Sequence, residues 1–308
     1  MTDLHQAATE YLAVRRALGF KLAGYDRLLE DFIGYLCRCD VPTVTTKAAL
    51  SWATGPQGVT PHYWSSRLGA VRGFARHLQG VDPTVEVPPA NLVVSGPCRR
   101  SAYQFSPQDL ERLVAEAGRL ANPLRGATYE AFFGLLVCSG ARVGEAIKLD
   151  RADIDLAGGV ADINDAKFRK HRRLPLHHTA VAALERYSRL RDELCPKPKA
   201  PSFFVSTRGT RLLYVVVNQV FRELVDKTGL EDQPGAGHPR IHDLRHHFIM
   251  ATLADFHRQG ADPQGKLPLL SAYVGHSDPA WTYHYFHAGA EVLALAAERL
   301  EQFERGRR

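Results

Sequence analysis

Three features are missing from this sequence: a long apolar run, a secretory leader and a paired set of cysteines. No hydrophobic stretch reaches the ~18 residues needed to cross a membrane. The opening segment, MTDLHQAATEYLAVRR, has no basic stretch followed by an apolar core, so we expect no signal peptide. The five cysteines are odd in number and scattered. These absences predict a protein of the reducing cytoplasm with no membrane partner.

The sequence also lacks a complete set of metal ligands at a recognised spacing. Cys37 and Cys39 form a C-x-C pair, but no second pair stands at the spacing of a zinc ribbon. His242 and His246 are four apart on an expected helix, yet no glutamate lies between them as in H-E-x-x-H, and no third ligand is evident. We therefore expect neither a bound metal nor a cofactor.

Positive charge, in contrast, is present and clustered. The chain carries a net charge of +6 and has a pI near 9.1. Lysine and arginine gather in the segments CRRSAYQ, AKFRKHRRLPLHH, RYSRLRDELCPKPK and FERGRR. Such clusters favour an anionic polymer such as nucleic acid as the partner, although a solvated basic surface would have the same composition.

The first third of the sequence predicts a helical domain followed by a linker. Residues 1–82 read as helices, because apolar residues recur at intervals of three and four. Thr60-Pro61 predicts the start of one helix, whose polar face carries Arg72 and Arg76. These two arginines could contact DNA phosphates or could simply be solvated. The proline-rich, non-periodic segment 83–104 is predicted to be a linker.

A second domain is expected over residues 105–288, and the predicted fold class is mainly α with a small β-hairpin. Its expected elements are helices at 106–120 and 124–139 and strands at 159–164 and 172–177. The two strands would form a hairpin with a basic tip. The final segment, 289–308, is an amphipathic helix that packs either on its own domain or on a neighbouring subunit.

Several short motifs in this second domain carry reactive or charged side chains. Arg142 follows a predicted helix break at Gly140. An arginine at such a position is held rigidly and is suited to binding an anion. In HDLRHHF, His242 and Arg245 are three apart and face the same way on a helix, so both could donate to one phosphate. Gly275-His276-Ser277 is predicted to be a tight turn at a helix start, and Tyr285 lies nine residues beyond His276.

Taken in this order, the segments SGARVGEAIKLD, KFRKHRRLPL, HDLRHHF and YVGHSDPAWTYHYF resemble the tyrosine recombinase (phage-integrase-like) family. The resemblance covers residues 105 to 290, whereas the N-terminal part matches only in size, helix content and position. It implies a helical N-terminal core-binding domain and an α+β tyrosine-recombinase catalytic domain. The catalytic residues that it implies are Arg142, Lys167, His242, Arg245, His276 and the nucleophile Tyr285.

Two of these assignments have competitors. Lys167 stands eight residues before Pro175, like the family's hairpin lysine, but Lys170 lies in the same basic run. Tyr283, seven residues after His276, is the rival nucleophile. Glu145 and His246 resemble supporting positions of the family. The DNA-contacting residues expected with this resemblance are Arg72, Arg76, Arg99, Arg100, Lys170 and Arg172.

The resemblance implies a site-specific recombinase that cleaves and rejoins DNA through a 3′-phosphotyrosine, without metal or ATP. Its partners would be double-stranded DNA recombination sites, bound by a homotetramer on two sites, with a dimer or monomer when free. A mobile-element role is favoured over phage integration, cassette exchange or dimer resolution. The rival functions are a type IB topoisomerase-like nicking-closing enzyme and a non-catalytic DNA-binding regulator.

Overall fold

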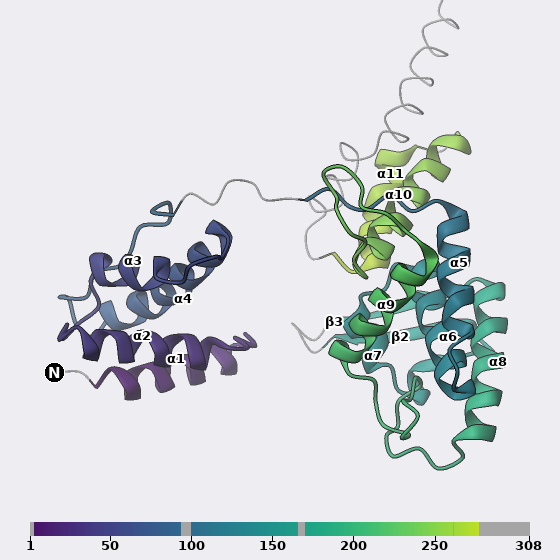
Figure 1. Cartoon of the computed structure of the whole chain (residues 1–308), viewed down its shortest axis with the longest axis horizontal. Helices are drawn as coiled ribbons and strands as arrows, with labels where there is room; N and C mark the ends of the chain where they lie inside the picture. The colour runs from purple at the N-terminus through teal and green to yellow at the C-terminus, as the bar shows by residue number, and fades with distance from the viewer. Residues whose placement is uncertain (1–2, 94–99, 166–169, 261, 277–308) are drawn as a thin grey trace, which may run out of the picture. The chain divides into compact units, whose positions relative to one another are not determined.

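The computed structural model describes residues 3–93, 100–165, 170–260 and 262–276. The chain separates into two compact units, Met1–Arg99 and Arg100–Arg308 (Figure 1). Each unit has a hydrophobic core of its own. No helix of the described part of the chain is long and apolar enough to cross a membrane.

The N-terminal unit is built from helices alone. Its elements are α1 (Leu4–Ala17), α2 (Tyr25–Arg38), α3 (Thr46–Thr54) and α4 (Pro61–Gln79). Side-chain oxygens of Asp3 and Thr45 cap the first and third helices, and Pro61 opens the fourth as the sequence predicts. The apolar stripes meet in a core that includes Phe32, Trp52 and Phe74, each almost fully buried.

The predicted linker, residues 83–104, is shorter than expected. Val85 is only 3% exposed and belongs to the N-terminal core, while the Glu86 amide donates to the Val44 carbonyl. Arg72 donates to the carbonyls of Pro88 and Pro89, both at 2.8 Å. The proline-rich stretch therefore packs along the first unit until at least Ala90, because its free carbonyls have a cation to bind.

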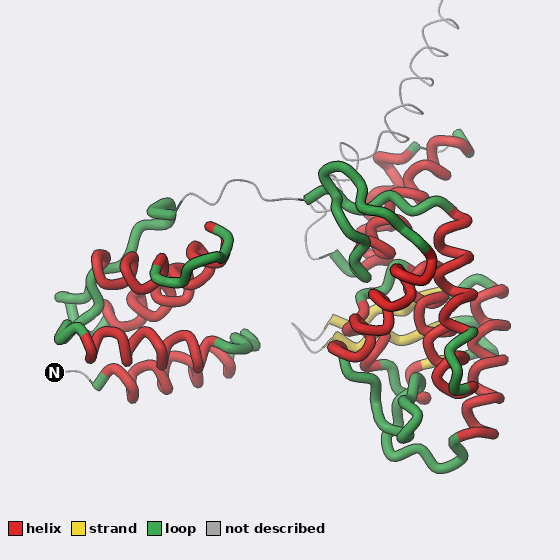
Figure 2. The backbone as a smooth tube through the Cα atoms, viewed as in Figure 1, coloured by secondary structure: helices red, strands yellow, loops and turns green. Residues whose placement is uncertain are grey.

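The second unit begins directly after Arg99. The Ser101 amide donates to the Gly235 carbonyl, and Tyr103 and Phe105 enter the core of this unit. Its described elements are α5 (Pro107–Gly118), α6 (Pro123–Ser139), α7 (Val143–Lys148), the 3₁₀ turn η1 (Arg151–Asp153), β1 (Ile154–Asp155), β2 (Val160–Asp165), β3 (Lys170–Pro175), α8 (His178–Leu194), α9 (Tyr214–Thr228), α10 (Asp243–Arg258) and α11 (Pro263–Val274). Helices predominate and the strands are short (Figure 2), which confirms the predicted fold class.

The sheet is antiparallel with the order β1-β2-β3. Strands β2 and β3 form the expected hairpin, with Val160 opposite Pro175 and Ile163 opposite Arg172. Leu174 is fully buried, and side chains two apart on a strand point to the same face. Arg172 is therefore directed to the core side of β3, while Arg173 points to solvent.

Candidate active site

A glycine ends α6 and sets the position of Arg142. Gly140 adopts the left-handed conformation with φ +60°, and a Cβ on it would lie 2.5 Å from the Phe248 ring. Only glycine fits this position without strain or collision. The chain then turns at once into α7, with Arg142 as its N-cap residue. The predicted helix break is therefore present, and it holds Arg142 on a packed base.

The C-terminal end of α11 is the organising element of the site. A helix end exposes carbonyls without helical partners and carries partial negative charge. Here three consecutive carbonyls each accept from a different arginine. The three bonds are Arg172 Nε to Tyr273 O at 2.9 Å, Arg245 Nη2 to Val274 O at 2.7 Å, and Arg142 Nη2 to Gly275 O at 2.8 Å. We call this group of three arginines the arginine clamp.

Glu145 joins two arginines of the clamp. Its Oε1 accepts from Arg142 Nη1 at 2.8 Å and from Arg172 Nη1 at 3.0 Å, while its Oε2 accepts from Arg172 Nη2 at 2.7 Å and from the Arg142 amide at 2.9 Å. The carboxylate is only 7% exposed. Burial raises its pKa, but the hydrogen bonds and charges of Arg172 and Arg142 outweigh burial and lower the pKa to about 2. Glu145 is therefore ionised and fixes both guanidinium groups.

Arg245 connects two helix ends. Besides Val274 O, it donates through Nη1 to Gly140 O at 2.7 Å, and it is only 2% exposed. It lies in the first turn of α10, three positions after the N-cap residue His242. The end of α6, the start of α10 and the end of α11 thus converge on one guanidinium.

Three histidines surround these cations. The rings of His242 and His246 meet edge to face, with centroids 4.8 Å apart, and His276 directly follows Gly275. Burial lowers the pKa of each, and the positive charge of Arg245 lowers it further; the pKa of His246 and of His276 falls to about 4. The imidazoles are therefore neutral at pH 7, in a site whose fixed charge is positive.

The exposure of the clamp indicates which cation a ligand can reach. The Arg142 side chain is 37% exposed, whereas the Arg172 side chain is 16% exposed and Arg245 is nearly inaccessible. A planar guanidinium held on two sides and open on the third suits an oxyanion, which it can bind with two hydrogen bonds. The site is therefore chemically fitted to a phosphate.

The structure brings together Arg142, His242, Arg245 and His276, four of the six predicted catalytic residues. Lys167 and Tyr285, together with the rival Tyr283 and with Arg99, lie outside the described residues. Lys170 is the first residue of β3. Gly275 is the C-cap residue of α11 and adopts the left-handed conformation. The residues after His276, where the sequence predicts a helix to start, lie outside the described residues. Among the described residues, no three His, Cys, Asp or Glu side chains are grouped as metal ligands.

The expected DNA-contacting residues differ in their surroundings. Arg76 and Arg100 are exposed. Arg72 is bound to backbone carbonyls of its own unit, and Arg172 is held by Glu145 and Tyr273. The internal position of Arg172 was not anticipated from the sequence. Its spacing of two residues from the apolar Leu174 on the same predicted strand was a signal that both side chains share the inner face.

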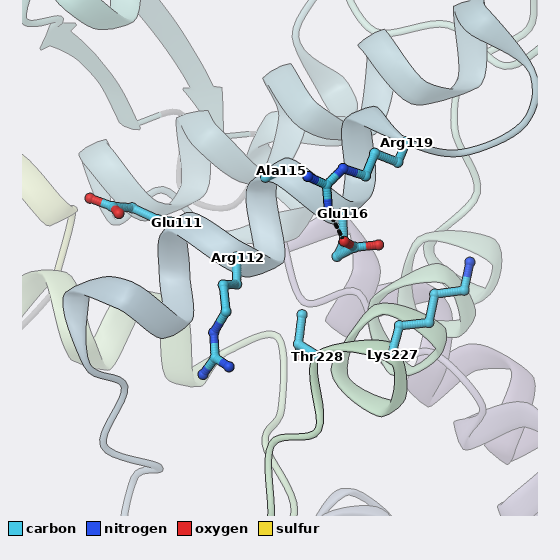
Figure 3. A pocket seen from close by; sticks show the side chains of 7 residues that line it. All are labelled: Glu111, Arg112, Ala115, Glu116, Arg119, Lys227 and Thr228. Atoms are coloured by element: carbon cyan, nitrogen blue, oxygen red, sulfur yellow. Dashed lines mark hydrogen bonds and ion pairs between the residues drawn. The ribbon is translucent and has the colours of Figure 1, made fainter.

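A separate hollow of about 400 Å³ lies between α5 and the end of α9 (Figure 3). Arg119 pairs there with Glu116, and Arg112 pairs with Asp109 at 2.6 Å. Because its lining includes the carboxylates Glu111 and Glu116 beside the cations, this hollow is a poorer match for a phosphate than the arginine clamp. The arginine clamp remains the candidate site.

Comparison with known proteins shows the family of this chain. The phage integrase family matches residues 104–291, which include every predicted catalytic residue. An integrase/recombinase of Sinorhizobium fredii, y4rB, is 38% identical over 98% of both chains. Tyrosine recombinase XerC of Escherichia coli is 28% identical over 96% of this chain and 95% of its own.

Solved structures share the fold at lower identity. The Tn1549 transposon integrase, in complex with a circular intermediate DNA, superimposes with a TM-score of 0.69 at 16% identity, covering 97% of this chain and 100% of that chain. A lambda integrase dimer bound to a core site superimposes with a TM-score of 0.64 at 18% identity, covering 90% and 96%. From the family match and the identity to its relatives, the chain belongs to the phage integrase family of tyrosine recombinases.

Proposed function

We propose that this recombinase cleaves duplex DNA by attack of the Tyr285 hydroxyl on a backbone phosphorus. The Tyr285 hydroxyl releases its proton to water as the Oη–P bond forms and the P–O5′ bond breaks, and a proton from Lys167 neutralises the leaving 5′ oxygen. The 3′-phosphotyrosine keeps the free energy of the phosphodiester. A 5′ hydroxyl of another strand then attacks it and restores the tyrosine, so no ATP is consumed.

The arginine clamp supports this proposal more than any other observation. The transition state carries negative charge on the non-bridging phosphate oxygens, and preorganised donors stabilise it most effectively. Arg142 offers the exposed guanidinium, already fixed by Glu145 and the end of α11. Arg245 supplies a second fixed charge, and the neutral rings of His242 and His276 add hydrogen bonds.

Trapping of the covalent intermediate tests the nucleophile. A nicked duplex loses the fragment that carries the 5′ hydroxyl after cleavage, so the protein–DNA adduct accumulates and is seen on a denaturing gel. We expect an adduct in EDTA with the wild type and with Tyr283→Phe, and none with Tyr285→Phe. An adduct that survives in Tyr285→Phe and disappears in Tyr283→Phe would reverse the assignment.

A modified leaving group separates Lys167 from Lys170. Sulfur at the bridging 5′ position leaves as a thiolate and needs little protonation, because a thiol has a pKa near ~8.5. If Lys167 is the general acid, Lys167→Ala cleaves normal DNA slowly and the sulfur substrate at nearly the wild-type rate. Lys170→Ala should show no such selective rescue. The opposite pattern would assign the role to Lys170.

The biological setting that we propose is a mobile element. The similarity to integrases, one of them from a transposon, supports this role. Relatives are seen bound to DNA recombination sites, one of them as a dimer, which supports double-stranded sites as the partner. We propose four subunits on two such sites as the active assembly. Recombinant products from two sites taken from DNA beside the gene would support exchange. Plasmid relaxation without such products would favour the topoisomerase-like alternative.

A further inference from the structure

A hollow lined by basic residues lies in the N-terminal unit, between α1 and α4. It has a volume of about 300 Å³ and is lined by Tyr11, Val14, Arg15, Gly73, Arg76 and His77. No carboxylate lines it. The catalytic residues belong to the other unit, so this hollow is a distinct feature of the molecule.

Arg15 lines this hollow and has no acidic partner in the part of the chain that the structure describes. Its guanidinium carbon lies 3.8 Å from the centroid of the Phe20 ring, a cation–π contact that restricts the side chain. Its Nε is buried and has no hydrogen-bond acceptor. A buried donor without an acceptor is unfavourable, so the binding of an acceptor against this guanidinium is favoured. The neighbouring Arg16, in contrast, pairs with Asp26 at 2.6 Å.

The opposite wall comes from α4. Arg76 is exposed, and within the described ranges its guanidinium makes no ion pair. A Cβ on Gly73 would lie 2.6 Å from the Tyr11 hydroxyl, so glycine at this position lets that hydroxyl line the hollow. Burial raises the pKa of Tyr11, which keeps the hydroxyl protonated and able to donate.

We propose that this hollow is a seat for one backbone phosphate of duplex DNA, bound by Arg15, Arg76 and the Tyr11 hydroxyl. The inference rests on the proposed function, because it takes the partner to be duplex DNA. Two guanidinium groups and a hydroxyl without a carboxylate match a phosphate and carry no means of reading bases. The seat therefore adds affinity and fixes the register of the N-terminal unit, independently of sequence.

A purely structural role predicts different behaviour. Arg15 and Arg16 both lie in the last turn of α1, where cations stabilise the negative end of the helix. If that were the whole role of Arg15, its loss would lower the melting temperature as the loss of Arg16 does. It would leave the salt dependence of DNA binding unchanged.

The test is the salt dependence of duplex binding by the full chain, measured by fluorescence anisotropy with a labelled duplex. The variants are Arg15→Gln, Arg76→Gln and their double combination, with Arg16→Gln as the control of equal charge on the same helix turn. Each seat variant should lower the slope of log affinity against log salt by about 0.9, the contribution of one phosphate. Because both arginines bind the same phosphate, the double variant should show about the same decrease in slope as each single variant.

The affinity loss expected for each seat variant is roughly tenfold and equal for unrelated duplex sequences. If the wild type binds DNA normally but Arg15→Gln, Arg76→Gln and Arg16→Gln have equal slopes, the phosphate seat is contradicted while the proposed function is not. A wild type that neither binds duplex DNA nor forms the adduct would overturn the proposed function, and the seat with it.

Discussion

Arg172 and Glu145 form a two-point ion pair between β3 and α7, with Nη1–Oε1 at 3.0 Å and Nη2–Oε2 at 2.7 Å. The same carboxylate also holds Arg142, and the same arginine also binds the end of α11. The pair therefore transmits the position of the sheet and of α11 to the one exposed guanidinium of the clamp. This relationship makes the site rigid before any DNA binds.

The first prediction concerns Glu145. Glu145→Gln leaves two buried guanidinium groups without their counter-charge, and loss of one partner of a buried pair costs on the order of 3 kcal/mol. We expect a lower melting temperature and slower adduct formation. The same change in Glu116→Gln, which removes a more exposed pair with Arg119, should cost about 1 kcal/mol or less.

The pH dependence of this effect follows from the lowered pKa. The folded-state pKa of Glu145 is about 2, below the ~4.3 of an unfolded glutamate. Its contribution to stability is therefore complete above pH ~4.3 and is lost as the pH falls toward 2. The stability difference between wild type and Glu145→Gln should shrink over this range in denaturant titrations. A difference that stays constant down to pH 2 would contradict an ionised Glu145.

The second prediction separates positioning from DNA contact at Arg172. Arg172→Lys keeps the charge but cannot reproduce the fork to Glu145 together with the bond to Tyr273 O. We expect adduct formation to slow by up to about 100-fold at saturating DNA, with unchanged salt dependence of binding. Arg173→Lys, on the solvent side of the same strand, is the control and should retain the wild-type rate. A reduced salt slope in Arg172→Lys would show direct phosphate contact instead.

The third prediction uses two glycines with the same backbone conformation. Gly229 ends α9 with φ +68° and Gly275 ends α11 with φ +71°. A Cβ on Gly229 meets nothing within 4 Å, whereas on Gly275 it would lie 2.6 Å from Arg172 Nη1. Both alanine variants incur about 1 kcal/mol of backbone strain. Only Gly275→Ala should additionally slow cleavage; equal cleavage rates in the two variants would show that the clamp tolerates displacement of Arg172.

The fourth prediction concerns the histidines. The pKa of His276 is about 4 in the free protein, below the ~6.5 of an unfolded histidine, because of burial and nearby arginine charge. Folding stability from this group is therefore full above pH ~6.5 and falls as the pH drops toward 4. His276→Gln should lose less stability than the wild type between pH 7 and pH 5 in denaturant titrations.

Bound phosphate should shift the same titration upward, since negative charge stabilises imidazolium. NMR titration of the His276 ring, without and with duplex DNA, measures this directly. An unchanged midpoint on DNA binding would place the phosphate away from His276.

Much of the fold was readable from local signals. Thr60-Pro61 at a helix start and the recurrence of apolar residues at intervals of three and four act within a few residues of chain, so capping chemistry and periodicity predicted the N-terminal helices. The order of the four motifs likewise identified the family. The boundary of the linker was misjudged, because whether Val85 packs on a core depends on which surface lies near it.

The sequence by itself therefore determined the helical fold, the hairpin and the identity of the candidate catalytic side chains. The tertiary structure decided what holds them. Arg142 and Gly275 lie 133 positions apart, and Arg172 and Tyr273 lie 101 apart. Every residue has the same backbone carbonyl, so the amino-acid sequence does not indicate that the carbonyls at the end of α11 accept hydrogen bonds from three arginines. That arrangement arises only when packing brings the start of α7, strand β3 and the start of α10 to the end of α11.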